Sequence, residues 1–266
     1  MFPKIAELGP ITLHSYGLLL AIAFLLSINL MARLAEQRNI ARNRSWDLGF
    51  VIIVSAVLGA KILMVISDLE GFMNNPSRFI SIEFWQAGGV YYGGLIGAVG
   101  GALFYTWKSY DLEFWTMADV AAPAVALGQS IGRLGCFAAG CDYGKPTDLP
   151  WAITFTSEYA HRFVGVPIGI PLHPSQIYES VVTFGLFIFL FWIYQKRRFS
   201  GQIFCIYLFF YGVTRFGLEF FRGDYNRGFV MDGLLSTSQF ISLLIVPSAI
   251  VVYFFLRKGV PRVTRG

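Results

Sequence analysis

An apolar stretch late in the chain carries four polar side chains at helical spacing: they are Tyr211, Arg215, Glu219 and Arg222. Spacings of four, four and three residues would place all of them on one face of a helix. Charged groups inside a membrane are costly, so they usually pair with one another or serve a function. Two interpretations stay open. Either Arg215 and Glu219 neutralise each other between helices, or the carboxylate holds the cation toward an anionic ligand.

A second stretch, GQSIGRLGCFAAGCDYG at residues 128–144, places one cation among glycines and two cysteines. Arg133 ends an apolar segment there. It either anchors a helix end or faces a ligand whose approach the glycines, including Gly144, permit. Cys136 and Cys141 are compatible with a disulfide, metal ligands, a nucleophile or simple packing. We predict no metal site, because no second Cys or His pair has zinc-like spacing.

The composition indicates which elements must position these groups. The chain has 266 residues, of which 55% are hydrophobic and only 14% are charged, and its mean hydropathy is +0.58. These values are typical of a membrane protein and not of a soluble domain. We expect an all-α, polytopic membrane protein with about seven transmembrane helices in a single domain over residues 1–266. The predicted segments are 13–33, 47–67, 88–107, 114–133, 175–195, 201–221 and 234–256.

Lysine and arginine residues set the expected orientation. Twelve of the 21 fall in the loops on one side and six on the other, and the richer side is expected to be cytoplasmic. The N-terminus then lies outside and the C-terminus inside, and the long connection at about 134–174 is periplasmic. The basic residues do not cluster on a polar domain, so the net charge of +5 does not indicate nucleic-acid binding. We do not expect the first segment to be a cleaved signal peptide.

With this topology, polar residues of several segments fall in the outer half of the membrane. Besides the four residues near position 215, they are His14, Tyr16, Lys61, Tyr92, Gln129, Arg133, His173, Ser175, Gln176, Tyr178 and Glu179. Their convergence predicts a polar cavity open to the outer leaflet. Because arginine matches phosphate in a bidentate way, we expect the ligand to be a phospholipid with an anionic headgroup.

Motifs along nearly the whole chain also resemble those of bacterial prolipoprotein diacylglyceryl transferases. These motifs are HSYG, GGVYYGGLIG, GRLGCFAAG followed by YG, HPSQIYES and YGVTRFGLEFFR. The resemblance implies an enzyme of the bacterial plasma (inner) membrane that needs no cofactor. Its substrates would be phosphatidylglycerol and the signal peptide of a preprolipoprotein. It would move the diacylglyceryl group to the lipobox cysteine thiol, form a thioether and release glycerol phosphate.

The resemblance also implies residue roles. Arg133 would hold the phosphate, Arg215 would stabilise its developing charge, and Glu219 would orient Arg215 or the glycerol. Tyr92 completes the expected catalytic set. The expected substrate-binding residues are His14, Tyr16, Gly144, Gln176, Tyr178, Tyr211 and Arg222.

The sequence departs from the family's usual pattern at four positions. Asn is usual where Cys136 and Ala139 stand, Glu where Cys141 stands, and one branch has His where Tyr92 stands. A tyrosine with a pKa near 10 is a poor base at neutral pH, so His14 and Glu219 remain alternative bases. A Cys136–Cys141 disulfide is a further hypothesis.

Two other functions compete with this interpretation. One is a non-catalytic phospholipid-binding or transport protein, since membrane proteins of that kind also carry buried Arg–Glu pairs. Against it, no inverted repeat is visible in the sequence. The other is a metal-dependent phosphatidyltransferase, which would need clustered carboxylates. The sequence shows only scattered acids in its membrane segments.

Overall fold

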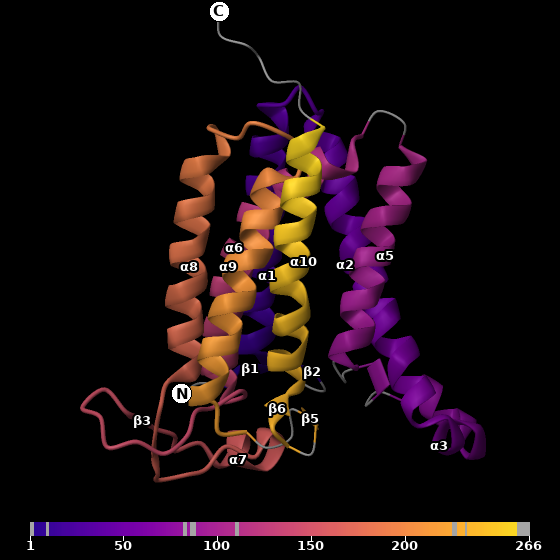
Figure 1. Cartoon of the computed structure of the whole chain (residues 1–266). Helices are drawn as coiled ribbons and strands as arrows, with labels where there is room; N and C mark the ends of the chain where they lie inside the picture. Colours follow the sequence, from indigo (N-terminus) through magenta and orange to yellow (C-terminus); the bar gives the residue numbers. More distant parts are fainter. Residues whose placement is uncertain are drawn as a thin grey trace, which may run out of the picture. The chain divides into compact units, whose positions relative to one another are not determined.

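The computed structural model of the chain describes residues 3–8, 11–81, 84–85, 89–109, 112–224, 228–231 and 233–259. It is mostly helical (Figure 1). The long helices are α1 (Ser15–Glu36), α2 (Arg42–Ser67), α5 (Tyr91–Lys108), α6 (Phe114–Ala139), α8 (Ser175–Tyr194), α9 (Gln202–Leu218) and α10 (Thr237–Lys258). Each of the seven predicted apolar segments is thus a helix.

Within these described residues, five helices are long and apolar enough to cross a membrane. They are α1, α2, α8, α9 with its short extension to Phe221, and α10. An integral, all-α membrane protein is therefore confirmed. The helices α5 and α6 do not meet the same measure of length and apolarity.

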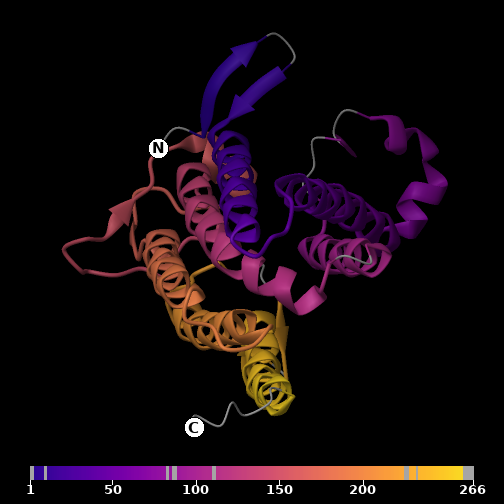
Figure 2. The ribbon, with the colours of Figure 1, turned by 90° about the horizontal axis from the view of Figure 1, so that it is seen from above.

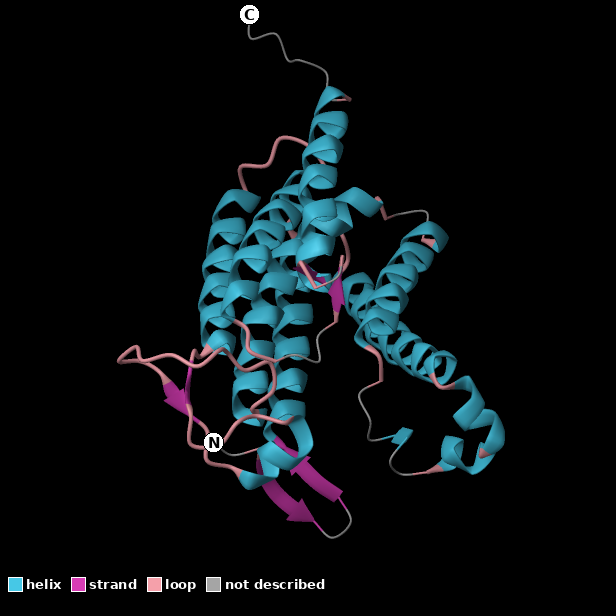
Figure 3. Cartoon of the chain, turned by 60° about the horizontal axis from the view of Figure 1, so that its bottom comes forward, coloured by secondary structure: helices cyan, strands magenta, loops and turns pink. Residues whose placement is uncertain are grey.

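Short elements connect the helices, and Figure 3 shows the strands among them in magenta. Three antiparallel strand pairs are formed by β1 (Lys4–Leu8) with β2 (Ile11–His14), β3 (Ile153–Thr154) with β4 (Pro171–Leu172), and β5 (Phe229–Val230) with β6 (Leu235–Ser236). The short helices are α3 (Leu69–Asn74), η1 (Pro76–Ile80), α7 (Glu158–Val164) and η2 (Glu219–Phe221). The long connection between α6 and α8 therefore has structure of its own.

The chain divides into two compact units, and the divisions fall inside α1 and α6. The unit formed by residues 32–117 is built on α2 and α5. A Cβ atom added to Gly97 would lie 2.1 Å from the Ser55 carbonyl oxygen, and one added to Gly59 would lie 2.2 Å from the Gly93 carbonyl oxygen. Small residues therefore let the two backbones touch. Gly93, Gly97 and Gly101 of α5 are spaced four residues apart and so lie on one face of the helix.

The other unit comprises residues 1–31 and 118–266. Seen from above, its long helices follow one another in the order α1, α6, α8, α9 and α10 (Figure 2). Gly135 of α6 lies against Tyr16 of α1, and the hydroxyls of Ser130 and Ser180 join α6 to α8. Helix α9 packs against both α8 and α10. The expected single domain over residues 1–266 stays a prediction.

Two helix ends differ from the sequence expectation. The helix predicted to end at residue 133 continues to Ala139 as α6, and Gly140 follows in the left-handed region (φ +86°). Glycine is the usual residue at this C-terminal position, because it has no Cβ to clash there. Helix α9 ends at Leu218 and tightens into the 3-10 turn η2. Arg222 therefore lies beyond the helix, and the prediction that it shares one helical face with Arg215 is wrong.

Asp119 positions the start of α9. Its buried carboxylate accepts hydrogen bonds from the backbone N–H groups of Gly201 and Phe204, both at 2.9 Å. It also pairs with Arg197 at 3.2 Å. The first N–H groups of a helix have no partner within the helix, so this carboxylate supplies one and complements the helix dipole.

Candidate active site

The site begins with an ion pair between the last turn of α9 and the first residue of η2. Arg215 Nη1 lies 2.8 Å from Glu219 Oε2, one helical turn away, and both side chains are almost fully buried. Arg215 Nη2 donates to Ser238 Oγ of α10 at 3.0 Å. The predicted Arg215–Glu219 pairing is confirmed.

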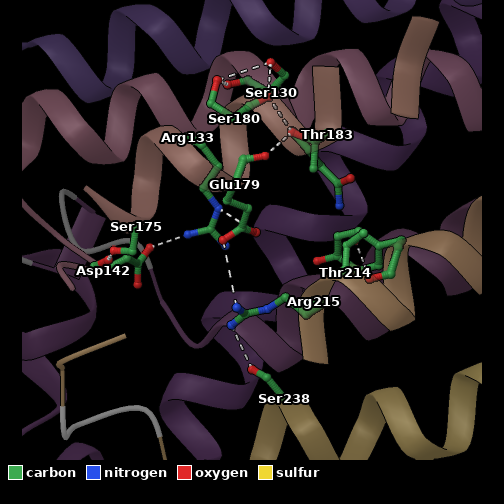
Figure 4. A network of polar contacts seen from close by, with 12 residues as sticks. Ser130, Arg133, Asp142, Ser175, Glu179, Ser180, Thr183, Thr214, Arg215 and Ser238 are labelled. Atoms are coloured by element: carbon green, nitrogen blue, oxygen red, sulfur yellow. Dashed lines mark hydrogen bonds and ion pairs between the residues drawn. The ribbon is translucent and has the colours of Figure 1, made fainter. Parts of the chain in front are cut away.

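A second carboxylate joins this pair to α6. Glu179, near the start of α8, has its Oε1 2.9 Å from Arg133 Nε and its Oε2 3.9 Å from Arg215 Nη1. Figure 4 shows Glu179 between the two guanidinium groups. Only 7% of the Glu179 side chain is exposed, so water screens these interactions weakly.

A third carboxylate extends the series into the loop after α6. Asp142 Oδ2 lies 2.6 Å from Arg133 Nη1, and Asp142 Oδ1 lies 2.5 Å from Arg222 Nη2. Arg222 also pairs with Asp224 at 2.6 Å. Burial acts to raise the pKa of the Asp142 carboxyl, but Arg133 and Arg222 more than offset this and hold the pKa below its ordinary value.

These contacts form one arginine–carboxylate network of seven residues with alternating charge. In order, its members are Glu219, Arg215, Glu179, Arg133, Asp142, Arg222 and Asp224. Three cations and four carboxylates give it a formal charge of −1. Helices α6, α8 and α9, the short turn η2 and the two loops that follow α6 and η2 supply its members. Figure 1 shows these ends of the three helices at the same end of this unit as β3 and α7.

The loop that carries Asp142 is held in place by the first residues of α8. Ser175 Oγ donates to the Asp142 carbonyl and Gln176 Nε2 donates to the Cys141 carbonyl, both at 2.7 Å. Gly144 makes an isolated β-bridge with Arg222. A Cβ atom on Gly144 would lie 2.2 Å from the His173 carbonyl oxygen. A larger residue would therefore push the loop away from Arg222.

Arg133 keeps donor capacity for a further group. A guanidinium has five N–H donors, and Arg133 meets Asp142 through Nη1 and Glu179 through Nε. Among the described residues, no partner of Arg133 Nη2 is found, and 20% of the side chain is exposed. The network thus orients a cation whose remaining donors suit a phosphate oxygen.

Other predicted binding residues lie around this network in different settings. Tyr16 is partly exposed and lies beside Gly135 of α6. Tyr211 stacks on Tyr207, with ring centroids 5.6 Å apart. Gln176 is buried, and within the described part of the chain its Oε1 has no hydrogen-bond partner.

Two predicted residues have partners outside the network. The His14 ring shares a hydrogen bond of 2.9 Å with the Tyr159 hydroxyl of α7. The Tyr178 hydroxyl accepts from Trp151 Nε1 at 2.7 Å and lies 3.2 Å from His173 Nδ1. Their expected roles in substrate binding stay predictions.

Tyr92 belongs to the unit built on α2 and α5, where its ring packs edge-on against Tyr91. Lys61 of the same unit donates to the Phe84 carbonyl and lies over the Phe84 ring. The expected catalytic role of Tyr92 stays a prediction.

Sequence reasoning missed part of the network. Glu179 stood among the polar groups but not among the expected site residues, and Asp142 and Asp224 were not expected there. The available signal was local: Asp142 follows the glycine-rich stretch that carries Arg133, and Asp224 lies two residues after Arg222. Cys136 and Cys141 are free cysteines in the structure, so the hypothesis of a disulfide between them is not supported.

The fold and this network together define a helical membrane protein with a buried, oriented arginine site. A sequence model of the prolipoprotein diacylglyceryl transferase family matches residues 3–255, and the chain belongs to this family. It is 38% identical over 254 residues to a phosphatidylglycerol–prolipoprotein diacylglyceryl transferase of Clostridium tetani, which covers 95% of this chain and 97% of the relative.

Two further relatives carry the same enzyme name. One from Clostridium perfringens is 34% identical, with 94% of this chain and 93% of the relative covered. One from Synechococcus elongatus is 30% identical, with 99% of this chain and 91% of the relative covered.

Proposed function

We propose that this chain transfers the diacylglyceryl group of phosphatidylglycerol to the cysteine thiol of a preprolipoprotein lipobox. The sulfur attacks the glyceryl carbon that carries the phosphate. A C–S bond forms, the C–O bond to phosphate breaks, glycerol phosphate leaves, and the thiol proton is released to water. Family membership and the arginine–carboxylate network support this proposal.

The arginines act on the phosphate. Arg133 binds a phosphate oxygen through Nη2, while Asp142 and Glu179 fix the plane of its guanidinium group. Arg215, held by Glu219 and Ser238, stabilises the charge that develops on the leaving group. A thiol has a pKa near 8.5 and is partly ionised at neutral pH. Nearby arginines raise that fraction, so the reaction needs no strong base.

We also propose the membrane arrangement. The 18-residue α5 and the 26-residue α6 cross the membrane together with the five more apolar helices, which gives seven crossings in a single domain. The N-terminus lies outside, the C-terminus lies in the cytoplasm, and the cavity opens to the outer leaflet of the bacterial inner membrane. The distribution of lysine and arginine between the loops supports this orientation. A fluorescent protein fused to the C-terminus should fold and fluoresce, whereas periplasmic alkaline phosphatase fused there should be inactive.

The observation that carries the proposed reaction is the Nη2 of a partly buried, doubly paired Arg133, for which the described part of the chain supplies no partner. The test is transfer by purified protein in detergent, given phosphatidylglycerol and a lipobox peptide with a free cysteine. The readout is a diacylglyceryl mass shift on the peptide. Arg133→Lys keeps the positive charge but loses the planar guanidinium group with its several N–H donors. We expect it to lower the rate of transfer on the order of 10²-fold.

Arg162→Ala is the matched control, because 77% of the Arg162 side chain is exposed and its ion pair with Glu158 of the same helix is a solvent-exposed one. It should transfer at the wild-type rate. Transfer by wild type and Arg162→Ala but not by Arg133→Lys supports the proposal. A folded wild-type protein that binds phosphatidylglycerol without modifying the peptide would instead indicate a non-catalytic lipid-binding protein.

A further inference from the structure

Two cysteines and an aspartate come together at the end of α6. The sulfur atoms of Cys136 and Cys141 and a carboxylate oxygen of Asp142 all lie within 4.8 Å of one another. The spacing in the sequence does not resemble a common zinc motif, so only the turn after Ala139 reveals the group. The backbone reverses there through Gly140 (φ +86°) and Asp142 (φ +57°).

We propose that these three side chains bind a thiophilic divalent cation of the Zn²⁺ type. Thiolates and a carboxylate are ordinary zinc ligands, and three protein ligands leave a fourth position for water. Two thiolates bound at about 2.3 Å in a tetrahedral site are about 3.8 Å apart. The ligand atoms therefore need to approach one another by only about 1 Å. Binding releases the two thiol protons to solvent.

The surrounding contacts prepare the site. Ser175 and Gln176 hold the carbonyl groups of Asp142 and Cys141, so the backbone that carries two of the three ligands is fixed on α8. The Cys141 sulfur lies 3.7 Å from the Cys136 carbonyl oxygen, which keeps it close to the last turn of α6. Hydrogen bonds to the groups around a metal ligand limit the reorganisation needed on binding.

The charges of the three ligands can be balanced by a divalent ion and the neighbouring arginines. Two thiolates and one carboxylate carry −3, and a divalent ion reduces this to −1. The two guanidinium groups beside Asp142 balance that remaining charge, since Arg133 and Arg222 pair with its two oxygens at 2.6 and 2.5 Å. A bound ion and the guanidinium groups then share the same carboxylate. Metal binding does not depend on the proposed transfer reaction, so the two proposals can fail separately.

The experiment is titration of the reduced, purified full-length protein with Co²⁺, followed by displacement with Zn²⁺. Co²⁺ bound by thiolate gives a near-ultraviolet charge-transfer band, and we expect saturation at one equivalent with intensity for two thiolates. Cys136→Ser and Cys141→Ser should each weaken binding by at least about tenfold, as should Asp142→Asn. Cys205→Ser is the control, because Cys205 is buried in α9 and should leave the band unchanged.

Three results would overturn the proposal. The first is no band in wild-type protein whose thiols react with an alkylating agent. The second is a Cys136–Cys141 disulfide that persists under reductant. The third is an equal affinity for Co²⁺ in the wild type and in Asp142→Asn, which would show that Asp142 is not a ligand. The band intensity of the wild type reports the number of thiolates even if a cysteine variant does not fold.

Discussion

Replacing Glu179 by glutamine tests whether one carboxylate holds both of the arginines that we propose bind phosphate. The substitution keeps the size of the side chain and removes its charge. Glu179 lies 2.9 Å from Arg133 and 3.9 Å from Arg215, and its side chain is 7% exposed. Without the Glu179 carboxylate, Arg133 retains its ion pair with Asp142. Arg215 retains its ion pair with Glu219 and its hydrogen bond to Ser238.

The size of the effect follows from these distances. At an effective dielectric constant of about 20, unit charges at 2.9 Å and 3.9 Å attract by about 6 and about 4 kcal/mol before desolvation. Desolvation offsets much of this, and removing one partner of a buried ion pair costs about 3–5 kcal/mol. If the substitution weakens the stabilisation of the transition state by about 3 kcal/mol, kcat/KM falls by about 150-fold, since each 1.36 kcal/mol corresponds to a factor of ten in rate.

The assay is peptide lipidation with varied phosphatidylglycerol, run beside thermal unfolding in the same detergent. Glu158→Gln is the matched control, because Glu158 is 81% exposed and pairs with Arg162 only at 3.8 Å. An exposed pair contributes about 0–1 kcal/mol, so we expect activity and melting temperature to stay at wild-type values. Glu179→Asp keeps the charge on a shorter side chain and should lie between wild type and Glu179→Gln.

Either of two results would refute this reasoning about Glu179. If Glu179→Gln retained wild-type kcat/KM and melting temperature, the carboxylate would not orient the arginines. If the melting temperature fell while kcat/KM of the folded fraction stayed unchanged, Glu179 would stabilise the bundle without positioning the reaction.

Three further predictions concern stability. Asp119→Ala should lower the free energy of unfolding by about 3–5 kcal/mol, because it leaves the buried Arg197 unpaired; chemical denaturation in detergent measures this. Gly144→Ala should lower stability by about 1–3 kcal/mol and reduce transfer, because its Cβ would collide with the His173 carbonyl; melting temperature and the lipidation assay together measure this. The pKa of Asp142 is lowered on folding, so its contribution is complete above the unfolded pKa of about 3.9 and is lost as pH falls through the lower folded value. Asp142→Asn should therefore flatten the acid side of a plot of melting temperature against pH, below about pH 4.

Local sequence patterns predicted the helices and one pair of the network. Apolar runs near twenty residues located all seven long helices, and a four-residue spacing predicted the Arg215–Glu219 pair. Both features depend on the geometry of a single helix, which the sequence specifies directly. The pattern failed at Arg222, because α9 tightens into a 3-10 turn before reaching it. Nothing in the spacing of these residues marks that change.

The remaining network members could not be predicted from spacing. Asp142 reaches Arg222 across 80 residues, and this contact depends on the turn at Gly140 and on the close approach of Gly144 to the His173 backbone. Both are tertiary features. A glycine-rich stretch signals freedom of the backbone, but it does not specify which side chains the resulting turn brings together.

If the proposed function is correct, the paired arginines show how a membrane protein can keep a phosphate site ready without its ligand. An isolated cation in this setting would be costly, and carboxylates on both sides of Arg133 hold its charge and its plane while leaving Nη2 as a donor. Because the network carries a formal charge of −1, it does not attract an anionic headgroup through net charge, and binding depends on directed hydrogen bonds. Phosphatidylglycerol has one negative charge on its phosphate, and the leaving glycerol phosphate gains a second as the C–O bond breaks. In the proposed reaction, oriented guanidinium groups would therefore interact more strongly with the transition state than with the bound lipid, and that difference is what accelerates a reaction.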